Sequence, residues 1–262
     1  MGQLDGRIAL VTGGGRGVGR AISELLAAEG AIVAVNYARD EVSARATVDG
    51  IVAAGGRARA FQAAVEDPEA DTAMVEAITA ELGVVDLLVN NAGIASRGRM
   101  VADTDAAEVA RVVGVHAFGP HHLCRLLMPA MRTRPRGDVV FISSVATTHM
   151  GPYGAPYNMG KAAMEALART LAKEERTNGI HVNVVAPGLV DTDMGKRLAR
   201  ATAGVPDIHM LDATMPFGHV CTPQEVAAVV LFVCSDAAAY LTGQRIEVDG
   251  GGPLGGTLRG AQ

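Results

Sequence analysis

A buried strand that runs straight into a glycine-rich loop and then into a helix constrains the fold of this chain more than any other feature. The apolar run Ile8-Ala9-Leu10-Val11 is typical of a strand covered on both faces of a parallel sheet. A glycine loop spans residues 12–19, and apolar residues of helical period then extend from Val18 to about Glu29, where Gly30 ends the helix. Glycines let the backbone approach a ligand closely, and the helix N-terminus favours negative charge. The loop therefore suits a pyrophosphate.

Strand-like and helical segments alternate along the rest of the chain. This alternation indicates a parallel sheet covered by helices on both faces. A chain of 262 residues with 49% hydrophobic content can bury a sizeable core, and we expect one domain over residues 1–262. After the first strand, the predicted strands are residues 31–36, 57–63, 87–90, 138–143, 181–186 and 245–248. After the first helix, the predicted helices are residues 40–54, 68–82, 104–132, 155–177 and 223–234, with a kink expected at Pro120.

Tyr157 and Lys161 stand four residues apart on a predicted helix. This spacing puts both side chains on one face, about one turn apart. A tyrosine ionises near pH ~10, and a nearby ammonium favours the phenolate, which would lower the pKa of Tyr157 toward the range useful for proton transfer. The pair alone proves little, since Tyr and Lys meet at this spacing by chance in many helices.

Taken together, the glycine loop and the Tyr157-x3-Lys161 pair resemble the short-chain dehydrogenase/reductase family. The loop reads Thr12-Gly13-x3-Gly17-x-Gly19, and no register of it satisfies G-x-G-x-x-G. Further matches follow in the order expected for the family, at Leu87-Leu88-Val89-Asn90-Asn91-Ala92-Gly93, Val139-Val140-Phe141-Ile142-Ser143-Ser144, Ile180-His181-Val182-Asn183-Val184-Val185-Ala186-Pro187-Gly188 and the segment 241–251. The resemblance covers nearly the whole chain. It implies an α/β fold with a Rossmann-like, doubly wound parallel sheet of about seven strands.

The resemblance also implies a reaction, the transfer of hydride between a nicotinamide and a carbonyl or secondary alcohol. In that reading Tyr157 is the acid/base, Lys161 lowers the pKa of Tyr157 and holds the nicotinamide ribose, and Ser144 donates a hydrogen bond to the developing alkoxide. Ser143 should point the opposite way. The implied cofactor-binding residues are Gly13, Gly15, Arg16, Gly17, Val18, Gly19, Arg39, Val65, Asn91, Gly93, Tyr157, Lys161, Pro187, Gly188, Val190 and Thr192.

The charges after the second strand favour NADP over NAD, although NAD stays possible. An acidic residue at this point would bond the ribose 2′-hydroxyl of NAD, whereas arginines accept the 2′-phosphate of NADP. By alignment with the family, Tyr37 stands where NAD-dependent members carry the acid, and Arg16 stands where NADP-dependent members often carry a basic residue. Arg39 is a second candidate, or a plain surface arginine whose charge Asp40 partly offsets.

Two positions depart from the family pattern. Ala64 stands where the family commonly has an aspartate that bonds the adenine, so only Val65 remains there for contact. His116 stands where the family presents an asparagine that holds a water in the proton relay. A histidine can bond water and can gain a charge near pH ~6.5, which would give the activity an acid limb. The other reading, a packed helix histidine outside the relay, is kept open.

The segment 195–217 breaks the alternation, and the surrounding region 193–222 occupies the place of the family's substrate lid. The overall likeness is to beta-ketoacyl carrier-protein reductases, on Asn36-Tyr37-Ala38 and Pro216-Phe217-Gly218. We therefore expect a small-molecule ketone or beta-ketoacyl substrate and leave its identity open. Candidate pocket residues are Ala146, Met150, Tyr153, Met194, Leu198, Met210 and Met215.

Composition excludes several other roles. A formal net charge of −5 offers no broad basic face for nucleic acid. Three widely spaced cysteines without C-x-x-C are typical of a reduced, cytoplasmic protein, and no apolar run or leader predicts membrane association. His121 and His122 lack carboxylate or thiolate partners at zinc-like spacing, so we expect no metal site.

Two further expectations rest on the resemblance. Family members form homotetramers or dimers through the helices predicted at 104–132 and 155–177 and through the last strand, and we expect a homo-oligomer. The alternative function is a cofactor-binding sensor that keeps the fold and has lost turnover. Ala64 and His116 favour that alternative, and the presence of Ser144, Tyr157 and Lys161 argues against it.

Overall fold

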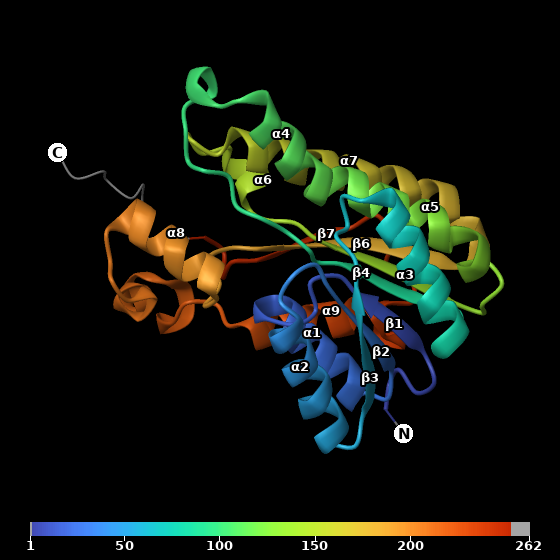
Figure 1. Ribbon diagram of the computed structural model, residues 1–262. Coiled ribbons are helices and arrows are strands. Elements are labelled where there is room, and N and C mark those ends of the chain that lie inside the picture. Colours follow the sequence, from blue (N-terminus) through green and yellow to red (C-terminus); the bar gives the residue numbers. More distant parts are fainter. Residues whose placement is uncertain (1, 253–262) are drawn as a thin grey trace.

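The computed structural model describes residues 2–252, which form a seven-stranded parallel sheet with helices on both faces (Figure 1). The first residue and residues 253–262 of the predicted domain lie outside the described residues. The strand order is β3-β2-β1-β4-β5-β6-β7. The strands are β1 (Ile8–Val11), β2 (Ile32–Tyr37), β3 (Arg57–Gln62), β4 (Leu87–Asn90), β5 (Gly137–Ile142), β6 (Ile180–Pro187) and β7 (Arg245–Val248). The predicted doubly wound fold and its strands are confirmed, with ends that differ by one or two residues.

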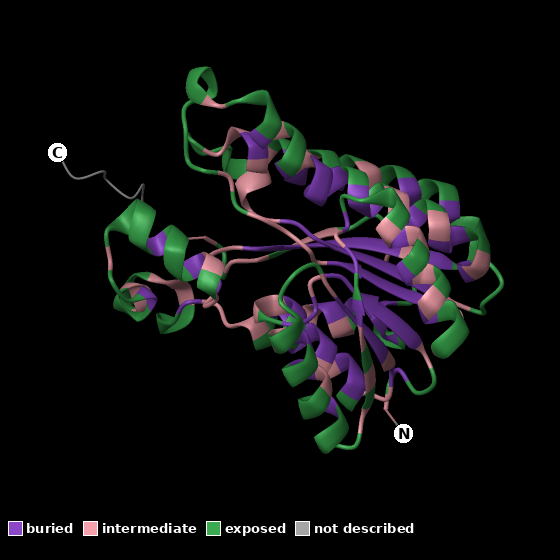
Figure 2. Ribbon diagram, viewed as in Figure 1, coloured by how far each residue is buried: buried purple, intermediate pink, exposed green. Residues whose placement is uncertain are grey.

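Two layers of helices sandwich the sheet, and each layer closes its own apolar core (Figure 2). One layer contains α1 (Gly17–Ala28), α2 (Glu41–Ala53) and α9 (Pro223–Cys234), with Ile22 and Val230 among its fully buried side chains. The other contains α3 (Pro68–Glu81), α5 (Gly119–Met131) and α7 (Ala155–Glu175), with Ile78, Leu123 and Met164 fully buried. Strands covered on both faces read as continuous apolar runs, which is why β1, β4 and β5 were predictable from sequence.

Polar side chains at the helix starts explain where several helices begin. Asp40 caps α2 by accepting a hydrogen bond from the Ser43 N–H, and Asp67 caps α3 in the same way. Thr222 and Glu225 form a capping box at α9. These caps place the first turns of the helices within a residue or two of the sequence prediction.

The helix predicted over residues 104–132 is interrupted just before Pro120, where a kink was expected. A helix, α4 (Ala106–Val113), is followed by one π-helical turn, η2 (Gly114–Phe118), and then by α5. Asp105 caps α4, which sets its start after the short 3-10 turn η1 (Val101–Asp103). Pro120 has no N–H to bond the carbonyl of the residue four before it, so regular α-helical bonding is interrupted at His116.

The segment predicted to be irregular contains a helix that the sequence did not reveal. α8 (Asp193–Ala203) begins at Thr192, whose hydroxyl accepts from the Gly195 N–H, and stands apart from the sheet in Figure 1. A small core of Ala199, Ile208 and Val220 holds it against the following turns. The remaining short helices are α6 (Ala146–His149), η3 (Arg176–Asn178), η4 (Ile208–Thr214), η5 (Pro216–Gly218) and η6 (Asp236–Ala238).

Candidate active site

The carboxyl ends of the strands bring most of the predicted site residues to one edge of the sheet. The strand order reverses between β1 and β4, so the connections after these two strands leave toward opposite faces and open a crevice between them. The glycine loop follows β1, and Asn91 follows β4. Ser144 follows β5, and Pro187 ends β6 beside it, since the Val145 N–H donates to the Pro187 carbonyl at 3.1 Å.

Hydrogen bonds to the segment after β4 brace the glycine loop. The Thr12 hydroxyl accepts from the backbone N–H groups of Asn91 and Ala92, each at 2.9 Å. The Asn91 amide donates to the carbonyls of Thr12 and Gly13 at 2.8 and 3.2 Å. The amide nitrogen of Asn91 thus helps to hold the loop in shape, and its direct contact with a cofactor stays a prediction.

Two glycines of the loop could not carry a side chain. A Cβ at Gly19 would lie 2.2 Å from the Gly13 carbonyl oxygen, so only glycine lets α1 pack this closely under the loop. Gly17 has a φ of +52°, and a Cβ there would lie 3.2 Å from the Thr192 methyl group. The loop after β6 therefore contacts the start of α1. The two ends of the predicted cofactor site, the glycine loop and the loop after β6, meet at this contact.

The N-terminus of α1 is able to bind an anion. Arg16 is the N-cap residue of α1, and its side chain makes no capping hydrogen bond to the first turn. First-turn N–H groups are then available to an external acceptor, and the helix dipole adds positive potential. This arrangement fits the pyrophosphate of a dinucleotide.

Two arginines stand beside this helix end, where β1 and β2 run in parallel register. Arg16 and Arg39 are both exposed, and Arg16 Nη1 lies 4.0 Å from Asp40 Oδ2. Hydrogen bonds from the Ser43 backbone and hydroxyl, with a smaller effect of Arg16, lower the pKa of Asp40. The carboxylate is therefore charged at neutral pH and offsets part of the positive charge, as the sequence suggested.

Ser144 and Tyr157 face each other across the end of β5. Ser144 is close enough to Tyr157 to act on its pKa, and the Ser144 hydroxyl oxygen accepts from the Ala146 N–H at 3.1 Å. Ser143 points the other way, as the alternation along a strand predicts, and donates to Glu165 Oε1 at 2.6 Å. Tyr157 is half-buried and lies in the first turn of α7.

Lys161 lies one turn after Tyr157, and its ammonium is fully inside the protein. The residue is only 3% exposed, and Nζ donates to the Ile142 carbonyl at 2.6 Å. Nζ lies 5.9 Å from the centroid of the Tyr157 ring. Burial lowers the pKa of Lys161 to about 7, with the Glu165 charge acting in the opposite direction. Lys161 thus changes charge near neutral pH.

The expected lowering of the Tyr157 pKa is wrong for this structure. Burial raises the pKa of Tyr157, and Ser144 opposes that rise only in part. The physical reason is that the Lys161 ammonium is directed to the Ile142 carbonyl, so desolvation of the phenolate dominates. The phenol remains protonated at neutral pH, which is the form that can donate a proton to an alkoxide.

His116 packs directly on the Tyr157 ring from the π-helical turn. The two ring centroids are 5.1 Å apart with an interplanar angle of 80°. Gly93 and Gly160 make room for the imidazole, because a Cβ at either position would lie 2.8 and 2.9 Å from His116 atoms. Nε2 lies 2.8 Å from the Ile94 carbonyl, and the buried Nδ1 has no hydrogen-bond partner among the described residues.

The expected titration of His116 near pH ~6.5 is wrong. Burial, reinforced by the Lys161 charge and opposed by the Ile94 backbone, lowers the pKa of His116 to about 3. The imidazole is therefore neutral in the physiological range. Nε2 lies 2.8 Å from the Ile94 carbonyl and 3.3 Å from the Ile94 N–H, and the shorter distance favours the tautomer in which Nε2–H donates and Nδ1 carries a lone pair. His116 lies in the site, and its part in a relay stays a prediction.

The remaining predicted cofactor residues lie along the same edge. Gly188 donates its N–H to the Val248 carbonyl at 3.0 Å, and Val190 is buried beside Cys221. Val65 is buried after β3, against Gly119. Gly15 packs on the backbone of Ala44, where a Cβ would come within 2.8 Å.

The predicted substrate residues are mostly at the surface of this edge. Met150, Tyr153, Leu198 and Met210 are exposed. Ala146, Met194 and Met215 are half-buried. Met150 and Tyr153 have φ angles of +47° and +63°, an uncommon conformation for residues with side chains. Backbone strain is thus concentrated in the segment that leads into Tyr157.

Sequence reasoning missed the residues that support Ser144 and Lys161 from behind. Glu165 and Thr147 hydrogen-bond to each other, and Arg245 binds both. One signal was present, because Glu165 stands four residues after Lys161 and so shares its helix face. Arg245 lies 80 residues farther along the chain, and no local pattern could have paired it with Glu165.

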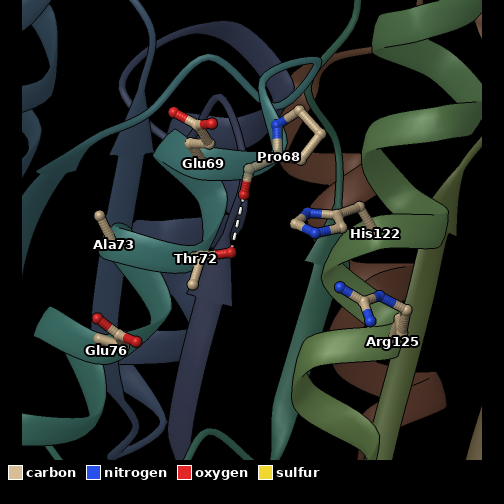
Figure 3. A pocket seen from close by; sticks show the side chains of 7 residues that line it. All are labelled: Pro68, Glu69, Thr72, Ala73, Glu76, His122 and Arg125. Atoms are coloured by element: carbon tan, nitrogen blue, oxygen red, sulfur yellow. Dashed lines mark hydrogen bonds between the residues drawn. The ribbon is translucent and has the colours of Figure 1, made fainter.

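A separate groove lies between α3 and α5 and contains none of the predicted site residues (Figure 3). Its volume is about 420 Å³, and it is lined by Pro68, Glu69, Thr72, Ala73, Glu76, His122 and Arg125. Within residues 2–252, no group of three or more His, Cys, Asp or Glu side chains gathers closely enough to hold a metal ion. None of the helices described is both long and apolar enough to cross a bilayer.

Sequence comparison shows that this chain is similar to known reductases. A family model described as enoyl-(acyl carrier protein) reductase matches residues 13–252. The 3-oxoacyl-[acyl-carrier-protein] reductase FabG of Escherichia coli strain K12 is 39% identical over 251 residues, which is 95% of this chain and 98% of that protein. The short-chain reductase protein NovJ of Streptomyces niveus is 40% identical over 250 residues, 94% of each chain.

Solved structures with the same fold carry nicotinamide cofactors. Angucycline C-6 ketoreductase LanV with bound NADP is 32% identical with a TM-score of 0.85, covering 95% of this chain and 96% of that chain. A 7α-hydroxysteroid dehydrogenase complexed with NADH and 7-oxo glycochenodeoxycholic acid is 33% identical with a TM-score of 0.87, covering 95% of each chain. The similarity extends over nearly the whole chain in both comparisons.

Proposed function

Because this chain belongs to the short-chain dehydrogenase/reductase family, we propose that it is an NADP(H)-dependent oxidoreductase that interconverts a carbonyl and a secondary alcohol. The observation that carries the proposal is the meeting of Ser144 and Tyr157, with buried Lys161 one turn away, at the sheet edge that also carries the glycine loop.

The roles of the residues follow from their protonation states. A bound nicotinamide would supply the hydride, and the glycine loop with the α1 N-terminus would hold its pyrophosphate. Tyr157, protonated at neutral pH because burial raises its pKa, gives its proton to the carbonyl oxygen. Ser144 donates a hydrogen bond to the same oxygen as charge develops there. Lys161, whose pKa is about 7, returns a proton toward Tyr157.

His116 is assigned a positioning role beside the phenol. Its ring edge packs at 80° to Tyr157, and its neutral state avoids a second positive charge next to Lys161. The lone pair on Nδ1 can accept from a water, as the asparagine of the family is thought to do. In this assignment His116 still takes part in the proton relay. Because its imidazole stays neutral, it gives the activity no acid limb.

The preference for NADP rests on Arg16 and Arg39 at the ends of β1 and β2. Both are exposed, with Arg16 4.0 Å from Asp40, and no acidic residue follows β2 until Asp40, which caps α2. The LanV structure contains NADP and the steroid dehydrogenase contains NADH, so the fold itself accepts either cofactor. The local charge supports NADP for this chain.

The proposed substrate is a ketone, with a beta-ketoacyl thioester as the favoured subclass. Two relatives support this choice, since FabG is a 3-oxoacyl-[acyl-carrier-protein] reductase and LanV is a ketoreductase. The segment 193–222, with α8 and η4, is proposed as the lid over this substrate. His209 joins the lid to the loop after β6, with Nε2 3.4 Å from Asp191 and Nδ1 3.3 Å from Asp212.

A homo-oligomer is also proposed. α7 carries exposed Met159, the neighbouring π-helical turn carries exposed Phe118, and Tyr240 is fully exposed before β7. These apolar side chains lie on the surfaces through which we expect copies of the chain to associate. Light scattering during gel filtration should give the mass of a dimer or tetramer, and the mass of a monomer at micromolar concentration would refute this part.

The experiment that tests the function is a substrate panel with NADPH and NADH. Purified protein is mixed with each cofactor and with ketones, a beta-ketoacyl thioester and an enoyl thioester, and the nicotinamide absorbance is followed. We expect consumption of NADPH with ketones or the beta-ketoacyl thioester. Consumption of NADPH only with the enoyl thioester would instead indicate enoyl reduction, the activity named in the description of the family model. Binding of NADPH without consumption across the panel would support the sensor alternative.

A further inference from the structure

A buried carboxylate lies directly behind the proposed catalytic groups. Glu165 is 8% exposed and follows Lys161 by one turn of α7. Its Oε1 accepts from the Ser143 hydroxyl at 2.6 Å, from the Thr147 hydroxyl at 2.7 Å and from Arg245 Nε at 3.0 Å. Three donors, from the residue after β5, from α6 and from β7, thus converge on one oxygen.

Arg245 extends this network to the backbone of Ser144. Its Nη2 donates to the Ser144 carbonyl at 3.2 Å and to the Thr147 hydroxyl at 3.0 Å. The outer side of the guanidinium pairs with Glu247. The segment that presents the Ser144 hydroxyl to Tyr157 is therefore held from behind by the same groups that bind Glu165.

Glu165 is charged in this environment. Burial acts to raise the pKa of Glu165, but the hydrogen bonds from Ser143, Thr147 and Arg245 together bring it below its ordinary value. Arg169 on the same helix lies 3.9 Å from Oε2 and is largely exposed, so solvent screens its charge from Glu165.

The charges around Lys161 come from few groups. On α7 it faces Glu165 and the protonated phenol of Tyr157, and from η2 it faces the neutral imidazole of His116. Among residues 2–252, Glu165 is the one negative charge that acts on its pKa, and it opposes the effect of burial. Without that charge, desolvation alone would favour the neutral amine.

We propose that Glu165 is a positioning residue with two effects: its charge stabilises the ammonium of Lys161, and its hydrogen bonds fix the strand end that presents Ser144. The second effect rests on the proposed function, because it matters only if Ser144 acts on a substrate. The first effect is a property of the protein itself. It can be measured without substrate or cofactor.

The chain offers a direct measurement of the first effect, because it contains only three lysines, Lys161, Lys173 and Lys196. Protein labelled with ¹³C at the lysine ε-carbon gives three signals, and Lys173→Arg and Lys196→Arg assign them. We expect the titration of Lys161 to move to lower pH by roughly one unit in Glu165→Gln. Glu247→Gln, which removes the other carboxylate on Arg245, should leave that titration in place. An unshifted Lys161 in Glu165→Gln would overturn the charge effect.

Kinetics test the second effect and separate it from the first. With saturating NADPH, the alkaline limb of kcat/KM should move to lower pH in Glu165→Gln by the same amount as the NMR titration. Thr147→Val removes one donor and keeps the charge, so kcat should fall ~5–10-fold while the Lys161 titration and the KM for NADPH stay unchanged. Unchanged kcat in Thr147→Val would overturn the positioning effect. If wild-type protein reduces no carbonyl, the proposed function has failed, and the NMR result still decides the charge effect.

Discussion

Burial changes the chemistry of Tyr157 and Lys161 in ways that complement each other. Desolvation disfavours whichever form is charged, so it raises the pKa of the phenol and lowers that of the ammonium to about 7. The donor is thereby kept protonated, and its neighbour is brought near the pH at which it can pass protons on. This pairing suits reduction of a carbonyl, because a protonated tyrosine can donate a proton to the carbonyl oxygen and a preformed phenolate could not.

Replacing Lys161 should stabilise the protein in a pH-dependent way. The folded-state pKa of about 7 lies below the unfolded value of 10.5, so below about pH 7 both states are protonated and the folded state bears the full cost of a buried charge. Lys161→Met should therefore raise the free energy of unfolding by ~1–3 kcal/mol at about pH 6, a net value that allows for the lost hydrogen bond to Ile142. The gain should become smaller as pH rises toward about 10. Urea unfolding at several pH values measures this. A gain that grows with pH would contradict it.

Replacing His116 should leave the acid side of the rate profile unchanged. Because burial and Lys161 hold the pKa of His116 at about 3, the ring does not titrate between about pH 5 and 7. His116→Asn should keep kcat within about tenfold, and both proteins should lack an acid limb in that interval. An acid limb that is present in wild type and absent from His116→Asn would restore the titration that the sequence suggested.

At the scale of elements, the contact between α3 and α5 contains a second perturbed carboxyl. Asp71 is fully buried, and its Oδ1 has no partner among residues 2–252. Burial, with the charges of Asp67 and Glu66, raises the pKa of Asp71 to about 7. Its Oδ2 lies 3.3 Å from His122 Nδ1, but burial, Arg125 and His121 lower the pKa of that imidazole, so no ion pair compensates.

Asp71→Asn should stabilise the protein only at higher pH. Below an unfolded-state pKa of 3.8 the carboxyl is protonated in both states, and its stability cost grows as pH rises from there through about 7. We expect Asp71→Asn to add ~1–3 kcal/mol at about pH 8 and almost nothing at about pH 4. Thermal unfolding at both pH values measures the difference, with the exposed Asp49→Asn as control. An equal gain at both pH values would show that charge is not the cause.

The elements that sequence predicted well are those whose signals are local. β1, β4 and β5 are continuous apolar runs, and α3 and α9 begin at capping residues. The π-helical turn around His116 was missed because it depends on Pro120 within a helix whose apolar period continues on both sides. α8 was missed because it packs mainly on its own following turns, so its apolar stripe is short.

At the scale of the whole molecule, the sheet edge joins two functions that lie far apart in sequence. The dinucleotide end is built after β1 and β2, and the proton-transfer end after β5 and in α7. Contact between Gly17 and Thr192 closes the edge between them. Motif order predicted which residues meet here. The protonation states could not be predicted, because they depend on the depth of burial and on contacts between separate segments, such as the bond from Lys161 to the Ile142 carbonyl.

Cofactor preference should depend on the two arginines at the dinucleotide end. Arg16→Ala combined with Arg39→Ala removes the positive charge that would meet a 2′-phosphate and leaves Asp40 in place. We expect the ratio of kcat/KM for NADPH over NADH to fall at least ~10-fold, mostly through a higher KM for NADPH. Arg20→Ala, an exposed arginine of α1 paired with Glu24, is the matched control. A ratio unchanged by the double substitution would mean that other groups select the cofactor.

Tyr157→Phe tests the central claim most directly, because it removes one oxygen and keeps the ring that packs on His116. NADPH consumption with the best ketone of the panel is compared with wild type, and NADPH binding is measured on the same samples. The account predicts a loss of at least ~10³-fold in kcat with NADPH affinity within a few-fold of wild type. Turnover close to wild type in Tyr157→Phe would contradict the assignment of Tyr157 as the proton donor.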